Sequence, residues 1–201
     1  MHKVEEYISN EEKSNFFVIK EFDHSNVIFN EGEHCTGISF VISGQVLIVT
    51  STYNEKEEII NVINEGEMFG DVLCFSTNPF YLGNVIAKKK TKILYLPIDN
   101  FYKLIKVNSD FLVFLLNEIS DKTLVIKNQT KLLCHKNIKD RIIYYLNSEC
   151  KKKKTKEINI SSVEKLSNIL SLPRPSVSRE LSKLEREGLI KKEKNTIKIL
   201  F

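Results

Sequence analysis

Long apolar runs are absent from this 201-residue chain: no segment approaches the roughly 18 consecutive apolar residues that a membrane-spanning helix needs. Residues 1–13 carry glutamates where the apolar centre of a signal peptide would stand. The hydrophobic content of 42% is that of an ordinary globular protein. We therefore expect a cytoplasmic protein with no membrane partner.

Clusters of metal ligands and catalytic groups are also missing. The four cysteines are dispersed without Cys-x-x-Cys spacing, and the four histidines include no His-x-His pair. No nucleophile-base pair and no phosphate-cradling glycine loop is visible. We predict no enzyme activity, no metal site, no bound cofactor and, inside a cell, no disulfide. Three alternatives stay open: an iron-sulfur cluster assembled from distant cysteines, haem held by a pair such as His34-Cys35, and a cupin-like metal-binding enzyme.

Arginine is scarce and confined to the C-terminal part of the chain. All four arginines lie at position 141 or beyond, and residues 135–201 carry 17 Lys and Arg against 8 Asp and Glu. Residues 1–134 carry 13 against 18, so the two parts have net charges of +9 and −5. A basic end on an acidic body favours attachment to a polyanion such as DNA.

Residues 158–201 show the pattern of two helices, a tight turn between them and a terminal β-hairpin. The first helix begins at Ser161 or Ser162, and Ser161 with Glu164 fits a capping box. The proline at position 173 ends this helix, because proline restricts the preceding residue and has no N–H to donate. The order of elements predicts a winged helix-turn-helix, although a plain helical hairpin with solvated arginines fits the same pattern.

The second helix, which starts near Arg174, separates an apolar side from a polar side. Val177, Leu181 and Leu184 recur at helical spacing and form its buried stripe. The polar side carries short hydroxyls and arginines, which suit phosphates and the guanine edge in the major groove. The residues predicted to contact DNA are Ser162, Arg174, Ser176, Ser178, Arg179 and Lys183.

Between residues 16 and 97 the apolar pattern becomes that of short strands. Runs such as 38–50 and 90–98 are rich in Ile, Val and aromatic residues, and glycines at 32, 44 and 66 mark turns. Several short strands with turn signals about every ten residues indicate an antiparallel sandwich or barrel. We expect a compact β-roll with an internal pocket.

A heptad pattern begins after Asp110. Apolar residues and two threonines recur at alternating steps of four and three. Such a helix either packs on its own β-domain or pairs with a second copy, and we favour a parallel homodimer. The predicted dimer-interface residues are Leu112, Leu116, Ile119, Thr123, Ile126, Thr130 and Leu133.

Three segments, 28–48, 64–75 and 172–190, carry in this order a resemblance to a known family. The chain resembles the CRP/FNR family, that of the cyclic-AMP receptor protein and the fumarate-nitrate regulator, over nearly its whole length from about residue 16. The resemblance implies an α+β fold, with an N-terminal antiparallel β-roll of the cyclic-nucleotide-binding jelly-roll type, a long dimerisation helix and a C-terminal winged helix-turn-helix. The expected domains are 1–107, 108–135 and 136–201.

The resemblance also implies a dimeric transcription regulator on a palindromic operator in double-stranded DNA, with RNA polymerase as a candidate partner. Arg174 and Arg179 match the family's base-reading positions. Pro175 stands where the cyclic-AMP receptor protein has a glutamate after the first arginine, and proline cannot accept a hydrogen bond from cytosine. We therefore expect a half-site that differs from that relative's.

The nucleotide cassette departs from the family pattern. Gly70 is followed by Asp71 in place of a ribose-binding glutamate, and residues 78–84 lack the Arg-Ser pair that holds the cyclic phosphate. We predict that cyclic AMP is not the effector. The aromatic residues that replace the pair either fill the pocket or line it for an unknown, more apolar small-molecule effector. The candidate pocket residues are Gly70, Asp71, Val72, Phe80, Tyr81, Leu82, Thr123, Ile126 and Lys127.

Overall fold

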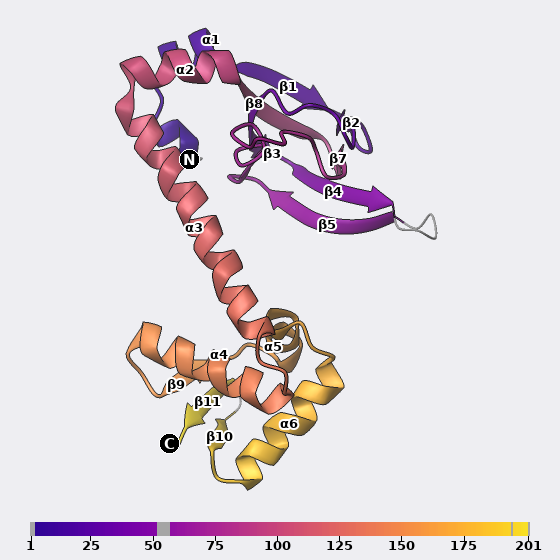
Figure 1. Cartoon of the computed structure of the whole chain (residues 1–201), viewed down its shortest axis with the longest axis vertical. Coiled ribbons are helices and arrows are strands. Elements are labelled where there is room, and N and C mark those ends of the chain that lie inside the picture. Colours follow the sequence, from indigo (N-terminus) through magenta and orange to yellow (C-terminus); the bar gives the residue numbers. More distant parts are fainter. Residues whose placement is uncertain (1–2, 52–56, 194, 201) are drawn as a thin grey trace. The chain divides into compact units, whose positions relative to one another are not determined.

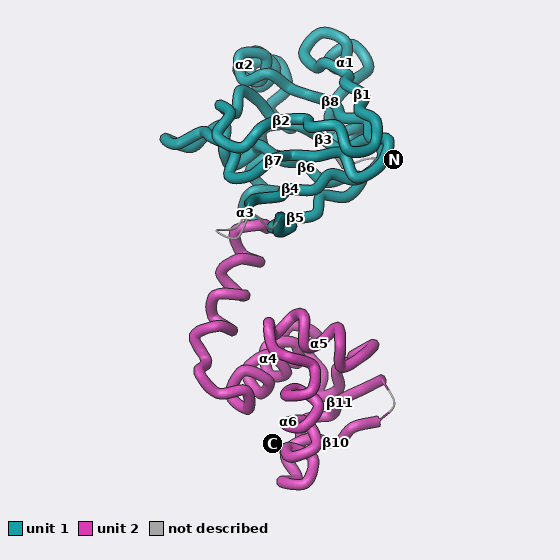
Figure 2. Tube along the Cα trace, turned by 90° about the vertical axis from the view of Figure 1, so that its right-hand side faces the viewer, with its two compact units in different colours: residues 1–120 teal, residues 121–201 magenta. Residues whose placement is uncertain are grey.

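The computed structural model describes residues 3–51, 57–193 and 195–200. Contacts within the chain divide it into two compact units, residues 1–120 and 121–201, and each has its own hydrophobic core (Figure 2). The boundary falls inside the long helix α3 (Ser109–Leu133). No helix in the described part of the chain has the length and apolar character that a membrane crossing requires.

The first unit is a β-roll made of two antiparallel four-stranded sheets (Figure 1). Its sheets have the strand orders β1-β8-β3-β6 and β2-β7-β4-β5. The strands are β1 (Val18–Phe22), β2 (Val27–Phe29), β3 (Gly37–Ser43), β4 (Gln45–Ser51), β5 (Glu57–Asn64), β6 (Met68–Phe69), β7 (Asn84–Ala87) and β8 (Thr91–Pro97). The expected antiparallel β-roll is confirmed.

Strand β3 shows why part of this roll lacks a simple alternation of apolar and polar residues. Ile38 and Phe40 belong to the cluster that packs against the helices, whereas Val41 belongs to the cluster between the two sheets. Both faces of the strand are therefore covered, and its first five residues are all buried. A strand buried on both faces reads as a continuous apolar run.

The turn Asn-Glu-Gly-Glu occurs twice, at 30–33 and 64–67, with the same hydrogen bonds. The asparagine N–H donates to the second glutamate's carboxylate at 2.9 Å in the first turn and 2.6 Å in the second. The glycines, Gly32 and Gly66, have φ angles of 75° and 85°, which side chains with a Cβ rarely adopt. The predicted glycine turns at these positions are confirmed.

Three helical segments and the start of α3 cover one face of the roll. They are the 3-10 helix η1 (Lys3–Glu6), α1 (Asn10–Phe16) and α2 (Ile98–Val107). Asn100 of α2 donates to the Phe16 carbonyl at 2.9 Å, which ties α2 to α1. Phe111 and Leu115, from the first turns of α3, are buried in the same core. The beginning of α3 is thus part of the first unit.

The described part of the second unit contains the last turns of α3, three further helices and a three-stranded antiparallel sheet of order β10-β11-β9. Its elements are α4 (Ile138–Lys153), β9 (Glu157–Asn159), α5 (Val163–Leu170), α6 (Arg174–Arg186), β10 (Ile190–Glu193) and β11 (Thr196–Ile199). Twelve buried apolar side chains, among them Ile142, Leu166 and Leu184, form its core. Helix α5, the turn, helix α6 and the β10-β11 hairpin confirm the predicted winged helix-turn-helix.

Helix α5 begins at one of the two predicted start positions, but without the predicted capping box. Its N-cap is Ser162, whose Oγ accepts a hydrogen bond from the Lys165 N–H at 3.0 Å. Glu164 is therefore the second helical residue, one position too early to complete a capping box with this cap. The predicted Ser161–Glu164 capping box was wrong, because the chain stays extended for one residue more than the motif suggested.

Candidate DNA-binding surface and effector site

Helix α6 presents its polar residues to solvent because its apolar residues are fixed in the core. Val177, Leu181 and Leu184 are buried in the core of the second unit. Five of the six predicted DNA contacts lie on this helix and are exposed or half-buried. They are Arg174, Ser176, Ser178, Arg179 and Lys183. The sixth, Ser162, is the exposed N-cap of α5, and its hydroxyl hydrogen is still available to donate to a phosphate while its oxygen caps the helix.

The side chains on the exposed side of α6 make weak contacts with their own helix. Arg179 Nε donates to the Pro175 carbonyl at 3.4 Å, and Lys183 Nζ lies 4.0 Å from Glu180 Oε1. Within the part of the chain that the structure describes, the Arg174 guanidinium makes no hydrogen bond or ion pair. These charged groups can therefore turn to a nucleic acid without breaking strong internal hydrogen bonds.

The wing is anchored to α6 by contacts that the sequence pattern did not reveal. The Lys192 N–H donates to Glu185 Oε1 at 2.9 Å, and Lys192 Nζ lies 3.0 Å from Glu185 Oε2. Lys192 Nζ also donates to Ser182 Oγ at 3.1 Å. The backbone hydrogen bond from Lys192 lowers the pKa of the Glu185 carboxyl. This lysine therefore positions the hairpin, a role that a count of basic residues cannot distinguish from DNA contact.

One arginine has a structural role. Arg141 of α4 is partly buried, and its Nη1 donates to the Leu170 carbonyl at 3.1 Å while its Nη2 donates to the His135 carbonyl at 3.1 Å. The Leu170 carbonyl lies at the end of α5, where carbonyls have no partner within the helix. Arg141 thus joins α4 to the helix-turn-helix.

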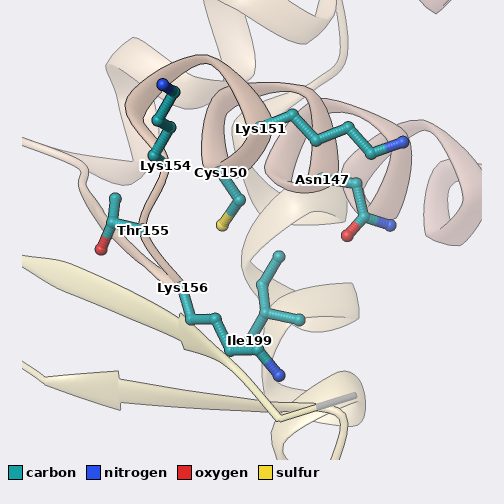
Figure 3. Close-up of a pocket in the computed structure, with 7 residues that line it drawn as sticks. All are labelled: Asn147, Cys150, Lys151, Lys154, Thr155, Lys156 and Ile199. Carbon is teal, nitrogen blue, oxygen red and sulfur yellow. The ribbon is translucent and has the colours of Figure 1, made fainter.

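A cavity of about 290 Å³ lies at the lysine-rich end of α4. Cys150 stands in the middle of this cavity with Ile199 below it, and the ammonium ends of Lys151, Lys154 and Lys156 point in different directions (Figure 3). Burial raises the pKa of the Cys150 thiol. Because the three cationic groups do not converge, the cavity offers no single point at which they would hold one anion.

Of the nine predicted effector-pocket residues, six lie in the β-roll and three in the part of α3 that belongs to the second unit. Gly70, Asp71 and Tyr81 are buried in the β-roll. Val72, Phe80 and Leu82 point outward and are 57%, 41% and 69% exposed. The remaining three, Thr123, Ile126 and Lys127, are exposed residues of α3 that belong to the second unit.

Tyr81 fills part of the roll interior. Its ring stacks on Phe29 with centroids 4.6 Å apart, and its Oη lies 3.5 Å from Cys35 Sγ. Burial raises the pKa of the Tyr81 phenol, so the group is neutral at physiological pH. Lys20 holds its Nζ 4.2 Å from the Tyr95 ring centroid. The interior of the roll is therefore lined by aromatic rings, and the Lys20 ammonium is held over the faces of two of them.

Ser39 is a buried polar residue of the β-roll whose hydroxyl lacks a partner among the described residues. It is fully buried on β3 and lies between Tyr95 and Phe69, its partners on the neighbouring strands. Its Oγ has no hydrogen-bond partner among the described residues. A hydroxyl in this position costs free energy unless something bonds to it.

The cysteines and histidines are arranged in a way that their spacing did not show. Cys35 and Cys74, dispersed in sequence, are neighbours in the roll, where the Cys35 thiol and the Cys74 N–H both donate to the Gly70 carbonyl. Cys134 is exposed just after α3, and the His34 ring packs edge-on against Phe80 with centroids 5.4 Å apart. The described residues contain no group of three or more His, Cys, Asp or Glu side chains that could hold a metal ion.

Comparisons with known proteins agree with this architecture. The cyclic nucleotide-binding domain family matches residues 19–108, and the Crp-like helix-turn-helix domain family matches residues 140–200. The cAMP-activated global transcriptional regulator CRP of Salmonella typhimurium is 23% identical over 185 residues, which cover 89% of this chain and 88% of that protein.

Solved structures share the fold at low identity. The Thermus thermophilus catabolite activator protein superposes with a TM-score of 0.54 at 19% identity, covering 98% of this chain and 93% of that one. The structure described as OCPA complexed CprK gives a TM-score of 0.63 at 18% identity, covering 99% and 91%. Together with the two matching domain families and their order, these findings place the chain in the CRP/FNR family of transcription regulators, as a cyclic nucleotide-binding domain followed by a DNA-binding Crp-like helix-turn-helix.

Proposed function

We propose that the chain acts as a homodimer that reads a palindromic operator through α6, and that cyclic AMP is not its effector. The observation that carries this proposal is the exposed, arginine-bearing side of α6, opposite a stripe that is locked in the core. In this arrangement Arg174 and Arg179 face base edges, where a guanidinium can bond guanine O6 and N7 together. Ser162, Ser176 and Lys183 face phosphates.

Helix α3 supports the proposal of a dimer through its exposed apolar side chains. Leu116, Ile126 and Leu133 of the predicted seam are 54%, 62% and 54% exposed, which is unusual for apolar residues aligned on one helix. Leu112 and Ile119, by contrast, pack against the core of their own roll. The seam thus serves two purposes in this proposal: its first turns hold the roll, and its exposed positions meet a second copy.

The domain limits follow from these roles. Residues 1–107 form the sensor domain, 108–135 the dimerisation helix, and 136–201 the DNA-binding domain. Two such DNA-binding domains would place their α6 helices in successive major grooves, with half-site centres about 34 Å apart. RNA polymerase is a partner in this proposal, as it is for a regulator that acts at promoters.

The interior of the roll supports the proposal that cyclic AMP is not bound. All four arginines lie in the second unit, so the roll has none to pair with a cyclic phosphate. Tyr81 instead packs inward on Phe29. Of the two interpretations of the aromatic cassette, we favour the filled pocket, in which the dimer binds DNA without a nucleotide. Calorimetric titration with cyclic AMP should give no heat of binding, and binding at micromolar affinity would contradict the proposal.

Selection of bound duplexes from a random DNA library tests the main proposal. We expect a two-fold symmetric consensus, and we expect sedimentation of the complex to show two chains on one duplex. An asymmetric consensus, or one chain for each duplex, would refute the proposal that a homodimer binds a palindromic operator. If no sequence is enriched from the library, the proposal that α6 recognises a DNA sequence is refuted.

A further inference from the structure

The β-roll brings two cysteines that are distant in sequence to the same carbonyl group. Strands β3 and β6 pair antiparallel with Ser39 opposite Phe69, so the chain entering β3 runs beside the chain leaving β6. Cys35 Sγ donates to the Gly70 carbonyl at 3.6 Å, and the Cys74 N–H donates to the same oxygen at 2.9 Å. Cys74 packs against the buried cluster that contains Cys35, and each of the two sulfurs shifts the pKa of the other.

The pair lies just beneath the surface of the roll. Cys35 is 2% exposed, and its Sγ also lies 3.5 Å from Tyr81 Oη. Cys74 is half-buried in the turn after β6, where its Sγ donates to the Asp71 carbonyl at 3.8 Å. Cys74 is therefore the member of the pair that lies nearer to solvent.

The two thiols differ in acidity, which assigns a chemical role to each. The hydrogen bond from Cys74, followed by that from Tyr81 and the charge of His34, lowers the pKa of the Cys35 thiol to about 6. The Cys35 sulfur beside it, burial and the charge of Asp71 raise the pKa of the Cys74 thiol. The further titratable groups around the pair are Tyr95 and Glu33, both near Cys35 and Tyr81. The thiolate is the nucleophilic form of cysteine, so Cys35 is the attacking sulfur and Cys74 the resolving one.

We propose that Cys35 and Cys74 form a dithiol site that a hydroperoxide oxidises to an intramolecular disulfide, so that the β-roll responds to oxidants. Its regulatory consequence rests on the proposed function, whereas the chemistry does not. Thiol pairs of this kind are how proteins in reducing compartments use disulfides, transiently and as sensors.

The reaction balances with hydrogen peroxide as the oxidant. The Cys35 thiolate attacks one peroxide oxygen: an S–O bond forms, the O–O bond breaks, and the departing hydroxide takes up the proton that Cys35 had released, giving water. The Cys74 sulfur then attacks the sulfenic sulfur of Cys35: the S–S bond forms, the S–O bond breaks, and the hydroxyl leaves as a second water with the Cys74 proton. Two thiols lose two electrons and one peroxide gains them.

Movement of Cys74 would change the packing at the start of α3. Cys74 packs against both clusters of the first unit, the one between the sheets and the one that contains Phe111 and Leu115 of α3. Its neighbour Phe75 lies edge-on against Phe101 of α2, with ring centroids 5.0 Å apart. Drawing the Cys74 sulfur into a bond with Cys35 takes it off the helix-facing cluster. The packing that changes is therefore that of the helix which we propose to dimerise.

Peptide mapping after oxidation tests the proposal on the full chain. Reduced protein is treated with hydrogen peroxide, its remaining thiols are alkylated, and the intact protein and its peptides are weighed. The matched background is Cys134→Ser/Cys150→Ser, which removes the other two cysteines and keeps the pair. Wild type and this variant should each lose two alkylation sites and two hydrogens, and should yield a peptide joined through Cys35 and Cys74.

Two further measurements separate the outcomes. Cys74→Ser should stop at a sulfenic acid on Cys35, which a 1,3-dione traps. In the Cys134→Ser/Cys150→Ser protein, which keeps Cys74, the rate of peroxide consumption should rise as the pH passes through about 6, because Cys35 ionises there. Four alkylated cysteines in treated wild type, or a bond that uses Cys134 or Cys150 instead, would overturn the proposal. A protein that forms the disulfide but binds no DNA would refute the proposed function and leave the thiol pair standing. Unchanged affinity for the selected duplex on oxidation would overturn the regulatory consequence.

Discussion

At the scale of single residues, the same side-chain types serve different purposes in the second unit. Arg179 is held by one long contact, at 3.4 Å, to its own helix, whereas Arg141 donates to two carbonyls at 3.1 Å and is partly buried. Charge alone does not distinguish them. The difference lies in whether neighbouring carbonyls accept hydrogen bonds from the guanidinium. A surface guanidinium whose N–H groups lack such acceptors can donate to an external ligand.

Replacement of Arg179 should change specificity, and replacement of Lys183 should not. Arg179→Ala should weaken binding to the selected operator by about 1–3 kcal/mol, and the loss should concentrate at one base position. Lys183→Ala is the matched control: it should weaken all sequences alike and reduce the slope of log affinity against log salt by about one. Fluorescence anisotropy on single-base operator variants measures both. Equal losses on every sequence for Arg179→Ala would show that this arginine contacts backbone.

Ser39→Ala should stabilise the first unit. The substitution removes a buried hydroxyl that has no partner among the described residues, and the free energy of unfolding should rise by about 1 kcal/mol. Denaturant unfolding followed by tyrosine fluorescence measures the change. A loss of stability would show that water or a small molecule bonds to Ser39 in solution.

At the scale of elements, α3 divides its seam between two partners. Leu112 and Ile119 pack against the roll, whereas Leu116, Ile126 and Leu133 stay exposed. Thr130 Oγ1 donates to the Ile126 carbonyl at 3.0 Å, which satisfies the hydroxyl within the helix and leaves its methyl group for packing. Threonine in the seam is therefore compatible with an apolar interface.

Charged residues in the exposed part of the seam should separate the dimer. Leu116→Lys/Ile126→Lys should give a monomer, because four lysines would face one another across the interface. Val125→Lys is the control, since Val125 is 56% exposed and apolar but lies off the seam. Sedimentation velocity distinguishes the two states. A variant that remains dimeric would place the interface elsewhere.

Arg141 should stabilise the connection between α4 and α5. Arg141→Ala removes hydrogen bonds to two carbonyls and should lower the free energy of unfolding of the second unit by about 1.5–3 kcal/mol. Lys139→Ala, which breaks an exposed ion pair with Glu187, is the control and should cost less. Denaturant unfolding of both variants against wild type gives the comparison, and equal losses would assign no special role to Arg141.

At the scale of the whole molecule, two separate cores support two functions. The apolar clusters of the first unit and that of the second have no residue in common. The charge follows the same division, with +9 in residues 135–201 and −5 in residues 1–134. DNA affinity and oxidant chemistry can therefore be altered separately by substitution.

Leu146→Ala should show this separation. Leu146 is 1% exposed in the second core, so its truncation should cost about 2–5 kcal/mol there. Hydrogen exchange followed by mass spectrometry should show faster exchange in α4 to α6 and unchanged exchange in the strands of the roll. Equal acceleration in both units would contradict their energetic independence.

Elements whose signals are local could be predicted from the sequence. Helix α6 is predicted by Val177, Leu181 and Leu184 at helical spacing, and the turns at Gly32 and Gly66 by glycine flanked with Asn and Glu. Propensity, periodicity and turn chemistry act over a few residues, so the fold and the polar side of α6 could be predicted without coordinates.

Only the tertiary structure decided which distant residues meet. The pairing of β3 with β6 makes neighbours of Cys35 and Cys74. The antiparallel bridge between His34 and Phe80 holds the segment in which Tyr81 is buried while Phe80 and Leu82 are exposed. The same sequence signal, an aromatic cassette, fitted either a filled or an open pocket, because the direction of each side chain depends on strand register. Register is set by packing across the whole sheet, and no local pattern in this chain contains it.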